Sequence, residues 1–283
     1  MYYNMKQRTN YLKNIIVLKD VENLRSAQAD PAPGYAAERI ASLSAEEGNL
    51  YIASPDADLK ALSGNGIPFV VYVDTLADSA GTFFDGAKYV LEGEGEFDEE
   101  DFDRGELEKI YRRLNKIPWD ILETDRCVIK ETSLDDLDEF YAIYADPDIT
   151  RFTEDLMERS EEEKYTENYR DLIYEIYGHG IWTDLEKDTG RIIGRAGLDE
   201  RAGFDTPELG FVIGKPWQNQ GFAYEVCSAI LNWAADNDIE NVMSLTEKEN
   251  TAAVKLLEKL GFSAENTVNI GSAEYQMFEK GLK

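Results

Sequence analysis

Residues that bind metals or form disulfides are scarce in this sequence. Its 283 residues include two cysteines and one histidine. Cys127 and Cys227 lie far apart and match neither a disulfide framework nor the paired spacing of a zinc site. A single histidine excludes a His-rich metal site, and a Ser-His-Asp triad could form only around His179. We therefore expect no bound metal.

Long apolar runs are also absent. A membrane-spanning helix needs about 20 consecutive apolar residues, and no stretch comes near that length. The chain begins with basic residues, but the apolar stretch at 15–18 is too short for the core of a signal peptide. These absences predict a cytoplasmic protein with no membrane partner. Hydrophobic residues, 43% of the chain, are nevertheless sufficient for packed cores.

Basic residues are few relative to acidic ones. The chain has 29 Lys and Arg against 57 Asp and Glu, a net charge of −28. A phosphate backbone would be repelled by most of such a surface, so we expect no nucleic-acid partner. A cationic acceptor, such as an amine or a basic peptide, would be attracted. A generally solvated acidic surface explains the same charge, and we favour that simpler interpretation.

Residues 1–119 are predicted to form a small α/β accessory domain. Strands are expected at Asn49–Ala53, 67–73 and 87–92, with a helix at 35–48. The continuous apolar stretch 67–73 is typical of a strand buried on both faces of a parallel sheet. Strands and helices at this spacing predict a doubly wound, Rossmann-like fragment.

Two features of this first domain could carry chemistry. The domain faintly resembles haloacid-dehalogenase-like phosphatases, which need an Asp-x-Asp pair after the first strand. Asp56 and Asp58 follow a strand, but Ser54 as helix cap and Pro55 in the first turn place both acids in a helix. The acidic run 92–106 lacks the ordered spacing of a calcium loop and is expected to be solvated. We therefore expect a domain that is not catalytic.

The second domain is expected to begin near residue 120. Residues 117–125 are interpreted as the linker into it, and 120–283 as the domain itself. Its predicted elements alternate along the chain: a strand at 126–132, a helix capped by Ser133, a helix at 160–177, a hairpin at 180–200, a strand at 207–214, a helix at 221–236, a strand at 241–247, a helix at 250–261 and a closing strand pair.

The stretch KPWQNQGFAYEVC, residues 215–227, joins a strand to a helix through Gly221. Unpaired N–H groups and the dipole at a helix N-terminus favour an anion. Gly221 and the small Ala223 would allow a phosphate to approach the backbone closely. The Lys and Ser/Thr of a nucleotide-triphosphate loop are missing, so contacts to a γ-phosphate or magnesium are not expected. The joint therefore predicts a pyrophosphate held by backbone N–H groups.

Two motifs around this joint resemble those of the GNAT superfamily of N-acetyltransferases. Residues 218–223 match its Gln/Arg-x-x-Gly-x-Gly/Ala signature, and 250–262, NTAAVKLLEKLGF, resemble its second motif. The helix, strand and helix between them follow the order of the family, and the resemblance covers about 126–280. The short sequences ELG and LEKLGF resemble those of the branch that acetylates ribosomal-protein alanine N-termini. The resemblance implies an α/β mixed-sheet GNAT fold and acetyl-coenzyme A as cosubstrate.

The resemblance also implies which residues bind coenzyme A. The loop backbone would cradle the pyrophosphate, the preceding strand would pair with the pantetheine amides, and an asparagine would contact the pantetheine or the amine. The residues so implied are Phe211, Val212, Ile213, Gln218, Asn219, Gln220, Gly221, Phe222, Ala223 and Asn250.

Direct attack of an amine on a thioester needs a group that removes a proton from the amine. Glu208 opens the strand that would line the cofactor and is the candidate base, acting through a water. A strand-end glutamate without a role is the alternative interpretation. Leu257 stands where many relatives have a tyrosine that protonates the leaving thiolate, so the acid is unassigned. Tyr224 is close in sequence but is expected to pack within its helix.

Other reactive or aromatic residues are expected to be structural. We expect His179 in a turn, Cys227 in the core, and Trp182 and Trp217 packed rather than lining an acceptor pocket. Two functions remain from the sequence. The first is an N-acetyltransferase acting on a small-molecule amine or a peptide N-terminus. The second is a non-catalytic acetyl-coenzyme A sensor, which Leu257 favours.

Overall fold

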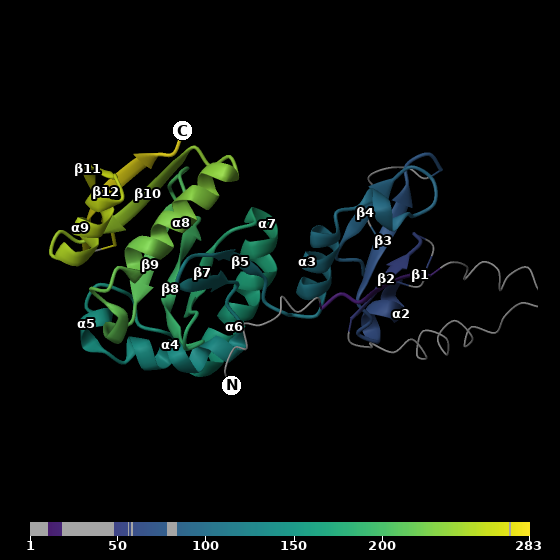
Figure 1. The fold of residues 1–283 in the computed structure, drawn as a ribbon, viewed down its shortest axis with the longest axis horizontal. Coiled ribbons are helices and arrows are strands. Elements are labelled where there is room, and N and C mark those ends of the chain that lie inside the picture. The colour runs from purple at the N-terminus through teal and green to yellow at the C-terminus, as the bar shows by residue number, and fades with distance from the viewer. Residues whose placement is uncertain (1–10, 19–47, 56, 58, 78–83, 272) are drawn as a thin grey trace, which may run out of the picture. The chain divides into compact units, whose positions relative to one another are not determined.

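The computed structural model describes residues 11–18, 48–55, 57, 59–77, 84–271 and 273–283. The chain forms two compact units that meet in the sequence between Ile117 and Pro118 (Figure 1). Each unit has its own sheet. None of the helices in the described ranges is both long and apolar enough to cross a membrane. The predicted acids Asp56 and Asp58, and the helix predicted at 35–48 up to residue 47, lie outside these ranges.

The first unit is built on a four-stranded parallel sheet in the order β1-β2-β3-β4. The elements described in it are β1 (Asn14–Val17), β2 (Asn49–Ala53), α2 (Leu59–Gly64), β3 (Phe69–Asp74), β4 (Val90–Gly93), the short 3-10 helix η2 (Glu99–Asp101) and α3 (Arg104–Leu114). The order of these strands follows the chain. The reversal of strand order that defines a doubly wound sheet is therefore absent from the described part.

The centre of this sheet has the predicted character, but the helix after β2 does not begin where expected. β2 is buried throughout and β3 is buried up to its last residue, Asp74, as an apolar strand inside a parallel sheet should be. The prediction that Ser54 caps a helix with Pro55 in its first turn was wrong. The Ala57 N–H donates to the Ser54 carbonyl at 3.1 Å, so these residues form a turn, and α2 begins at Leu59.

The acidic run 92–106 is anchored by aromatic rings. Phe97 and Phe102 stack with ring centroids 5.3 Å apart, and both meet Tyr72 edge-on. The Asp103 side chain accepts the Glu106 N–H at 3.0 Å and so caps α3. Among the described residues, no group of three or more His, Cys, Asp or Glu side chains is arranged to hold a metal ion.

The second unit contains an eight-stranded mixed sheet in the order β11-β12-β10-β9-β8-β7-β6-β5. Its strands are β5 (Asp120–Glu123), β6 (Cys127–Lys130), β7 (Ile181–Glu186), β8 (Ile192–Asp199), β9 (Glu208–Ile213), β10 (Asn241–Thr246), β11 (Ser263–Ile270) and β12 (Ala273–Gly281). Its helices are η3 (Leu134–Asp136), α4 (Leu137–Tyr144), α5 (Pro147–Thr150), α6 (Arg159–Tyr169), the π-helical segment η4 (Arg170–Tyr174), α7 (Glu175–Tyr177), η5 (Lys215–Trp217), α8 (Phe222–Asp236) and α9 (Thr251–Lys259).

One predicted boundary in this unit was wrong. Residues 117–125 were interpreted as a linker, but Asp120–Glu123 forms β5, which pairs antiparallel with β6 at the edge of the sheet. This four-residue strand alternates too briefly to be distinguished from a loop by its pattern alone.

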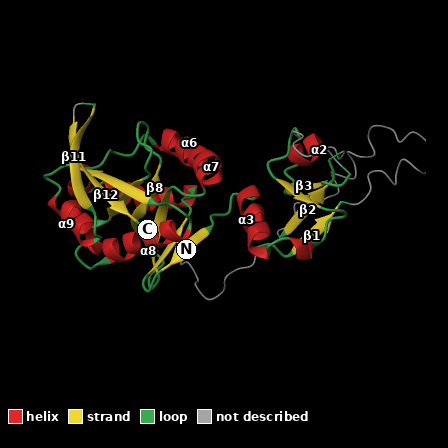
Figure 2. Ribbon diagram, turned by 90° about the horizontal axis from the view of Figure 1, so that it is seen from above, coloured by secondary structure: helices red, strands yellow, loops and turns green. Residues whose placement is uncertain are grey.

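Helices cover both faces of the large sheet (Figure 2). On one face, α8 and α9 bury Val226, Ile230 and Leu257 in a core that includes Ile193 and Leu198 of β8. On the other face, α4 buries Phe140 and Ile143 among strand side chains. Each face therefore has its own hydrophobic layer, and the residues of β8 and β9 alternate between the two layers.

The parallel strands β9 and β10 diverge. Their register contains a single pair, Glu208 with Met243, and the Ser244 hydroxyl donates to the Leu209 carbonyl at 2.9 Å just beyond it. Beyond this point the backbone edge of β9 that faces β10 is not paired with it. An unpaired strand edge inside a sheet offers N–H and C=O groups to an extended ligand.

A buried acid lies in the core beneath α8. Asp184 is fully buried, and neither of its carboxyl oxygens has a hydrogen-bond partner within the described structure. Burial raises the pKa of Asp184 well above its usual value. The folded protein therefore retains this proton to a higher pH than the unfolded chain, in which Asp has a pKa of about 3.9.

Asp184→Asn is expected to make stability less dependent on pH. Because folding takes up a proton at Asp184, the wild type loses stability as the pH rises from about 4 toward the folded-state pKa. The asparagine variant lacks this loss. The difference in unfolding free energy between the two proteins should grow by about 1.4 kcal/mol per pH unit in that range. Urea unfolding at pH 6, 7 and 8 measures it, and parallel stability curves would contradict an ionisable, unpaired Asp184.

Candidate active site

The joint between β9 and α8 has the backbone of an anion-binding loop. Gly221 is the N-cap of α8 with φ of +86°, and Asn219 is also left-handed with φ of +59°. The first bond into the helix runs from the Glu225 N–H to the Gly221 carbonyl at 3.0 Å. The N–H groups of the first helical turn, from Phe222 to Tyr224, therefore have no acceptor within the helix. They supply the donors that the sequence predicted for a phosphate.

Amide side chains fix the shape of this loop from inside. Gln218 Nε2 donates to the Ile213 carbonyl at 2.8 Å, and Gln220 Nε2 donates to the Pro216 carbonyl at 2.6 Å. Both side chains are thus engaged in holding the loop. The backbone N–H groups of the loop are therefore the donors that remain available to a ligand.

Glu225 and Arg126 brace the loop from outside. The Glu225 carboxylate accepts hydrogen bonds from the Thr124 hydroxyl at 2.6 Å and from the Arg126 N–H at 2.8 Å and Nε at 2.7 Å. Burial alone would raise the pKa of Glu225, but these donors hold it below its usual range. The Arg126 guanidinium also donates to the Gln220 carbonyl at 3.1 Å and lies 4.0 Å from the centre of the Phe222 ring. The sequence analysis missed Arg126 because it lies 94 residues from Gln220.

A cavity of about 830 Å³ opens beside β9. Four of the predicted site residues line it, namely Glu208, Phe211, Val212 and Asn250. Ile213 points into the core, with 7% of its surface exposed. The predicted loop residues 218–223 are not among the cavity's lining residues and lie at the start of α8. The predicted residues therefore fall into two groups at either end of the diverging strand.

Glu208 faces the cavity in an ion pair with Arg201. Its side chain is 13% exposed. Burial raises the pKa of Glu208, and the Arg201 guanidinium opposes this effect without cancelling it. A carboxylate with a raised pKa is a stronger proton acceptor than an exposed one, so the geometry and the electrostatics suit a general base.

Asp199 lies directly opposite Glu208 in the antiparallel register of β8 and β9. The Tyr169 hydroxyl donates to Asp199 Oδ1 at 2.7 Å and accepts the Ile181 N–H at 2.9 Å. Burial, followed by the charge of Asp199, raises the pKa of Tyr169 far above its usual value. Tyr169 is therefore a poor proton donor in catalysis and serves to position Asp199. The sequence analysis missed both residues, although Arg195, Gly197 and Asp199 alternate on one face of a strand.

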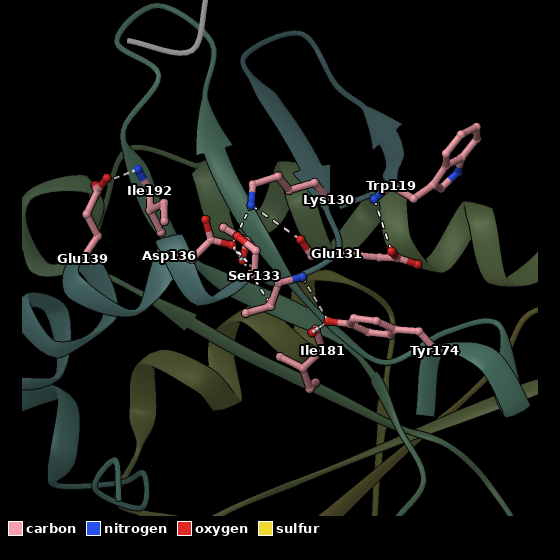
Figure 3. Close-up of polar contacts among 11 residues, drawn as sticks. Trp119, Lys130, Glu131, Ser133, Asp136, Glu139, Tyr174, Ile181 and Ile192 are labelled. Atoms are coloured by element: carbon pink, nitrogen blue, oxygen red, sulfur yellow. Dashed lines mark hydrogen bonds and ion pairs between the residues drawn. The ribbon is translucent and has the colours of Figure 1, made fainter. Parts of the chain in front are cut away.

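A buried polar network around Tyr174 and Ile181 (Figure 3) is linked to Tyr169 through the Ile181 N–H. Tyr174, its side chain directed at Ile181, donates to the Ile181 carbonyl at 2.5 Å and accepts the Thr132 N–H at 3.2 Å. The Thr132 hydroxyl lies 3.0 Å from that of Thr183. Because Ile181 holds both tyrosines, this network fixes the position of the Tyr169 hydroxyl relative to Asp199.

The network ends in a buried ion pair. Lys130 Nζ lies 2.5 Å from Asp136 Oδ2, which also accepts the Thr183 hydroxyl at 3.0 Å and the Ser133 N–H at 2.9 Å (Figure 3). The ammonium and carboxylate satisfy each other in a buried setting, so removing one partner would leave an uncompensated charge. The network thereby connects β6, β7 and the start of α4.

Asn250 was considered for the contact with the pantetheine or the amine, and Leu257 and Tyr224 were considered for the general acid. Asn250 lines the cavity and caps α9, its Oδ1 accepting the Ala253 N–H at 3.2 Å. Leu257 is fully buried and packs in the core. The prediction that Tyr224 packs within its helix was wrong. Tyr224 is 38% exposed, with Lys259 Nζ 4.0 Å from its ring centre, because the first turn of α8 projects it outward.

The remaining sequence candidates are structural. Cys227, Trp182 and Trp217 are buried in the core, as predicted. Burial raises the pKa of the Cys227 thiol well above its usual value, so it is inert as a nucleophile. His179 is also buried, with Nδ1 3.0 Å from the Leu198 carbonyl, and is not among the residues lining the cavity.

Comparison with known proteins finds a family model and several relatives that are similar to the second unit. Residues 126–263 match the family described as acetyltransferase (GNAT) domain. N-acetyltransferase p20 of Bacillus licheniformis is 25% identical over 150 residues, covering 51% of this chain and 83% of that protein. N-acetyltransferase YoaA of Bacillus subtilis is 26% identical over 153 residues, covering 52% and 85%.

Solved structures agree on the fold. A GnaT-family acetyltransferase from Bordetella pertussis superposes with a TM-score of 0.50 at 23% identity, covering 56% of this chain and 98% of that one. An acetyltransferase from Agrobacterium tumefaciens superposes with a TM-score of 0.50 at 18% identity, covering 56% and 92%. These coverages match the size of the second unit.

Proposed function

We propose that the protein, whose residues 126–263 match the family described as acetyltransferase (GNAT) domain, transfers an acetyl group from acetyl-coenzyme A directly to an amine. The observation that carries this proposal is the divergence of β9 from β10, which leads to the left-handed Gly221 at the start of α8. One unpaired strand edge and one anion-binding helix start follow each other along the chain. Extended amides followed by a pyrophosphate, the chemistry of coenzyme A, fit this order.

The chain's own residues would have distinct tasks in this reaction. Backbone N–H groups at 218–223 would hold the pyrophosphate, and the edge of β9 at 211–213 would hold the pantetheine amides. Bound acetyl-coenzyme A supplies a thioester that an amine can attack. Glu208 would remove the proton from the acceptor ammonium through a water, because only the neutral amine is a nucleophile. Leu257 is apolar, so no side chain is proposed as the general acid.

The acceptor is proposed to be a small-molecule amine or a peptide N-terminus. Six acidic side chains line the cavity and favour approach of an ammonium group, namely Glu154, Asp155, Glu162, Asp199, Glu208 and Glu247. The first unit is proposed to be an accessory domain without catalytic residues, since its described part is a small parallel sheet with one acidic loop.

Release of free thiol tests this function. Purified protein is mixed with acetyl-coenzyme A and a panel of amines and basic peptides, and the thiol is measured continuously. We expect release that depends on both the protein and an amine. Tight acetyl-coenzyme A binding without release for any amine would instead support the sensor function, and absence of binding would refute both.

Arg201→Met is expected to shift the pH dependence of this reaction. Arg201 opposes the effect of burial on Glu208, so its removal should raise the pKa of Glu208 further. The base must be deprotonated, so the acidic limb of the kcat/KM profile should move to higher pH. Arg201→Lys, which keeps the charge, should stay close to the wild type. An unmoved limb in the methionine variant would show that Glu208 does not control it.

A further inference from the structure

One face of the β8–β9 pair forms a floor beneath the cavity. Residues directly opposite each other in an antiparallel pair project to the same face, and every second residue returns to it. Three opposed pairs occupy this face in order: Arg195 with Val212, Gly197 with Gly210, and Asp199 with Glu208. Charged side chains therefore stand at both ends of the floor, and glycines lie between them.

The end at Asp199 has a net negative charge. Asp199 and Glu208 face each other there, and Arg201 is the guanidinium paired with one of them. The Tyr169 hydroxyl, hydrogen-bonded to Asp199, is neutral. Two carboxylates and one guanidinium leave a charge of about −1, which one ammonium group would neutralise.

The middle of the floor is kept free of side chains. A Cβ added to Gly210 would lie 3.2 Å from Ile181 Cδ1, and one added to Gly197 would lie 1.9 Å from the Gly180 carbonyl oxygen. Gly210 itself lines the cavity. The Gly180 backbone therefore covers Gly197, and a ligand between the two charged ends can lie against the strand backbone at Gly210.

The other end presents a guanidinium. Arg195 lines the cavity, its Nε donates to the Tyr144 hydroxyl at 2.7 Å, and it lies 4.8 Å from the Tyr144 ring centre and 5.6 Å from that of Phe140. No carboxylate within the described structure lies within 4.0 Å of it, and its two Nη groups have no acceptor there. A guanidinium held by aromatic rings with free Nη donors is preorganised to bind a carboxylate or phosphate in bidentate fashion.

Glu162 is a buried carboxylate near this end. It lines the cavity, but its Oε2 accepts the Met157 N–H at 3.1 Å and it forms no ion pair with Arg195. Burial raises the pKa of the Tyr144 hydroxyl. The charge of Arg195 lowers this pKa, whereas the charge of Glu162 raises it. Glu162 therefore weakens the positive potential at Arg195 without occupying the Nη donors.

We propose that the acceptor is a primary amine that also carries an anionic group, with the ammonium at Asp199 and Glu208 and the anion at Arg195. This inference rests on the proposed acetyltransferase function. Four residues of strand separate Arg195 from Asp199, about 14 Å between Cα atoms. The side chains shorten this span, so a separation of about 10 Å between amine and anion fits, which is the length of an extended tripeptide.

Triglycine and triglycine amide test the proposal as a matched pair. They share the amine and differ only in the carboxylate. Binding of each is measured directly by calorimetry, with and without coenzyme A, and thiol release is measured in parallel. The wild type is expected to bind triglycine about tenfold more tightly, or to show a tenfold higher kcat/KM. The net charge of −28 would by itself favour the cationic amide, so the expected preference runs against the overall field.

Substitutions at Arg195 locate the preference. Arg195→Met should bind triglycine and triglycine amide about equally, and Arg195→Lys should retain part of the preference for triglycine. Lys164→Met, which removes an exposed charge outside the cavity lining, should leave it unchanged. Equal binding of the two peptides by the wild type, or a preference that survives in Arg195→Met, would overturn the inference. Because binding is measured independently, a carboxylate preference without thiol release would refute the proposed function and leave this inference standing.

Discussion

Gly221→Asp is expected to abolish acetyl-coenzyme A binding, with a loss of affinity of at least about 100-fold. Gly221 ends the loop in a left-handed conformation beside the free N–H groups of α8. A carboxylate there would occupy those donors and repel the phosphates, and each 1.4 kcal/mol so lost is tenfold in affinity. Titration with acetyl-coenzyme A, followed by calorimetry, measures the effect.

Gly271→Asp is the matched control for this variant. Gly271 also has a positive φ, +61°, and a Cβ added there would meet nothing within 4 Å. Both substitutions carry the same cost of about 1 kcal/mol for a left-handed non-glycine residue. Only the variant at residue 221 should lose the ligand, and both should unfold cooperatively. Retained affinity in Gly221→Asp would mean that the loop does not hold the pyrophosphate.

The backbone conformation of the loop before α8 was predictable because its physical requirements are local. A glycine with positive φ, a helix start and an apolar strand before it lie within a dozen residues, so the sequence shows them together. The pairing of β9 with β10 was not predictable in this way. The divergence of β9 from β10 depends on where Glu208 and Met243 pair, and no pattern in either strand encodes that register.

The residues around the cavity were only partly predictable. Glu208 was found because it adjoins the loop strand. Tyr169 and Asp199 lie 30 residues apart in sequence and meet through tertiary packing. Two charged residues four positions apart in β8 were the available signal, since alternation places Arg195 and Asp199 on one face. The sequence analysis instead treated this strand as one half of a hairpin.

Two conformational predictions failed because sequence patterns are weak over short segments. Ser54 and Pro55 have the chemistry of a helix start, yet the Ser54 carbonyl accepts a turn hydrogen bond and the helix begins later. Tyr224 follows helical periodicity, but in the first turn of α8 its side chain extends beyond the packed layer. In both cases tertiary packing overrides the local preference.

Substitution of Glu208 is expected to have the second large effect. Glu208→Gln should lower kcat by about 100- to 1000-fold, the usual contribution of a positioned base, while the acetyl-coenzyme A Kd changes less than about twofold. The acidic limb of the pH profile, set in the wild type by the raised pKa of Glu208, should disappear with it.

Glu154→Gln separates proton removal from simple loss of cavity charge. Glu154 lines the same cavity but is exposed. Its substitution should change kcat less than about threefold, since Glu154 is exposed and lies outside the β8–β9 floor. If both glutamine variants slowed the reaction equally, the carboxylates would act through attraction of the ammonium alone. A selective loss at Glu208, with the pH limb removed, can arise only if this carboxylate takes the proton, because an electrostatic role would survive in part through Asp199 opposite it.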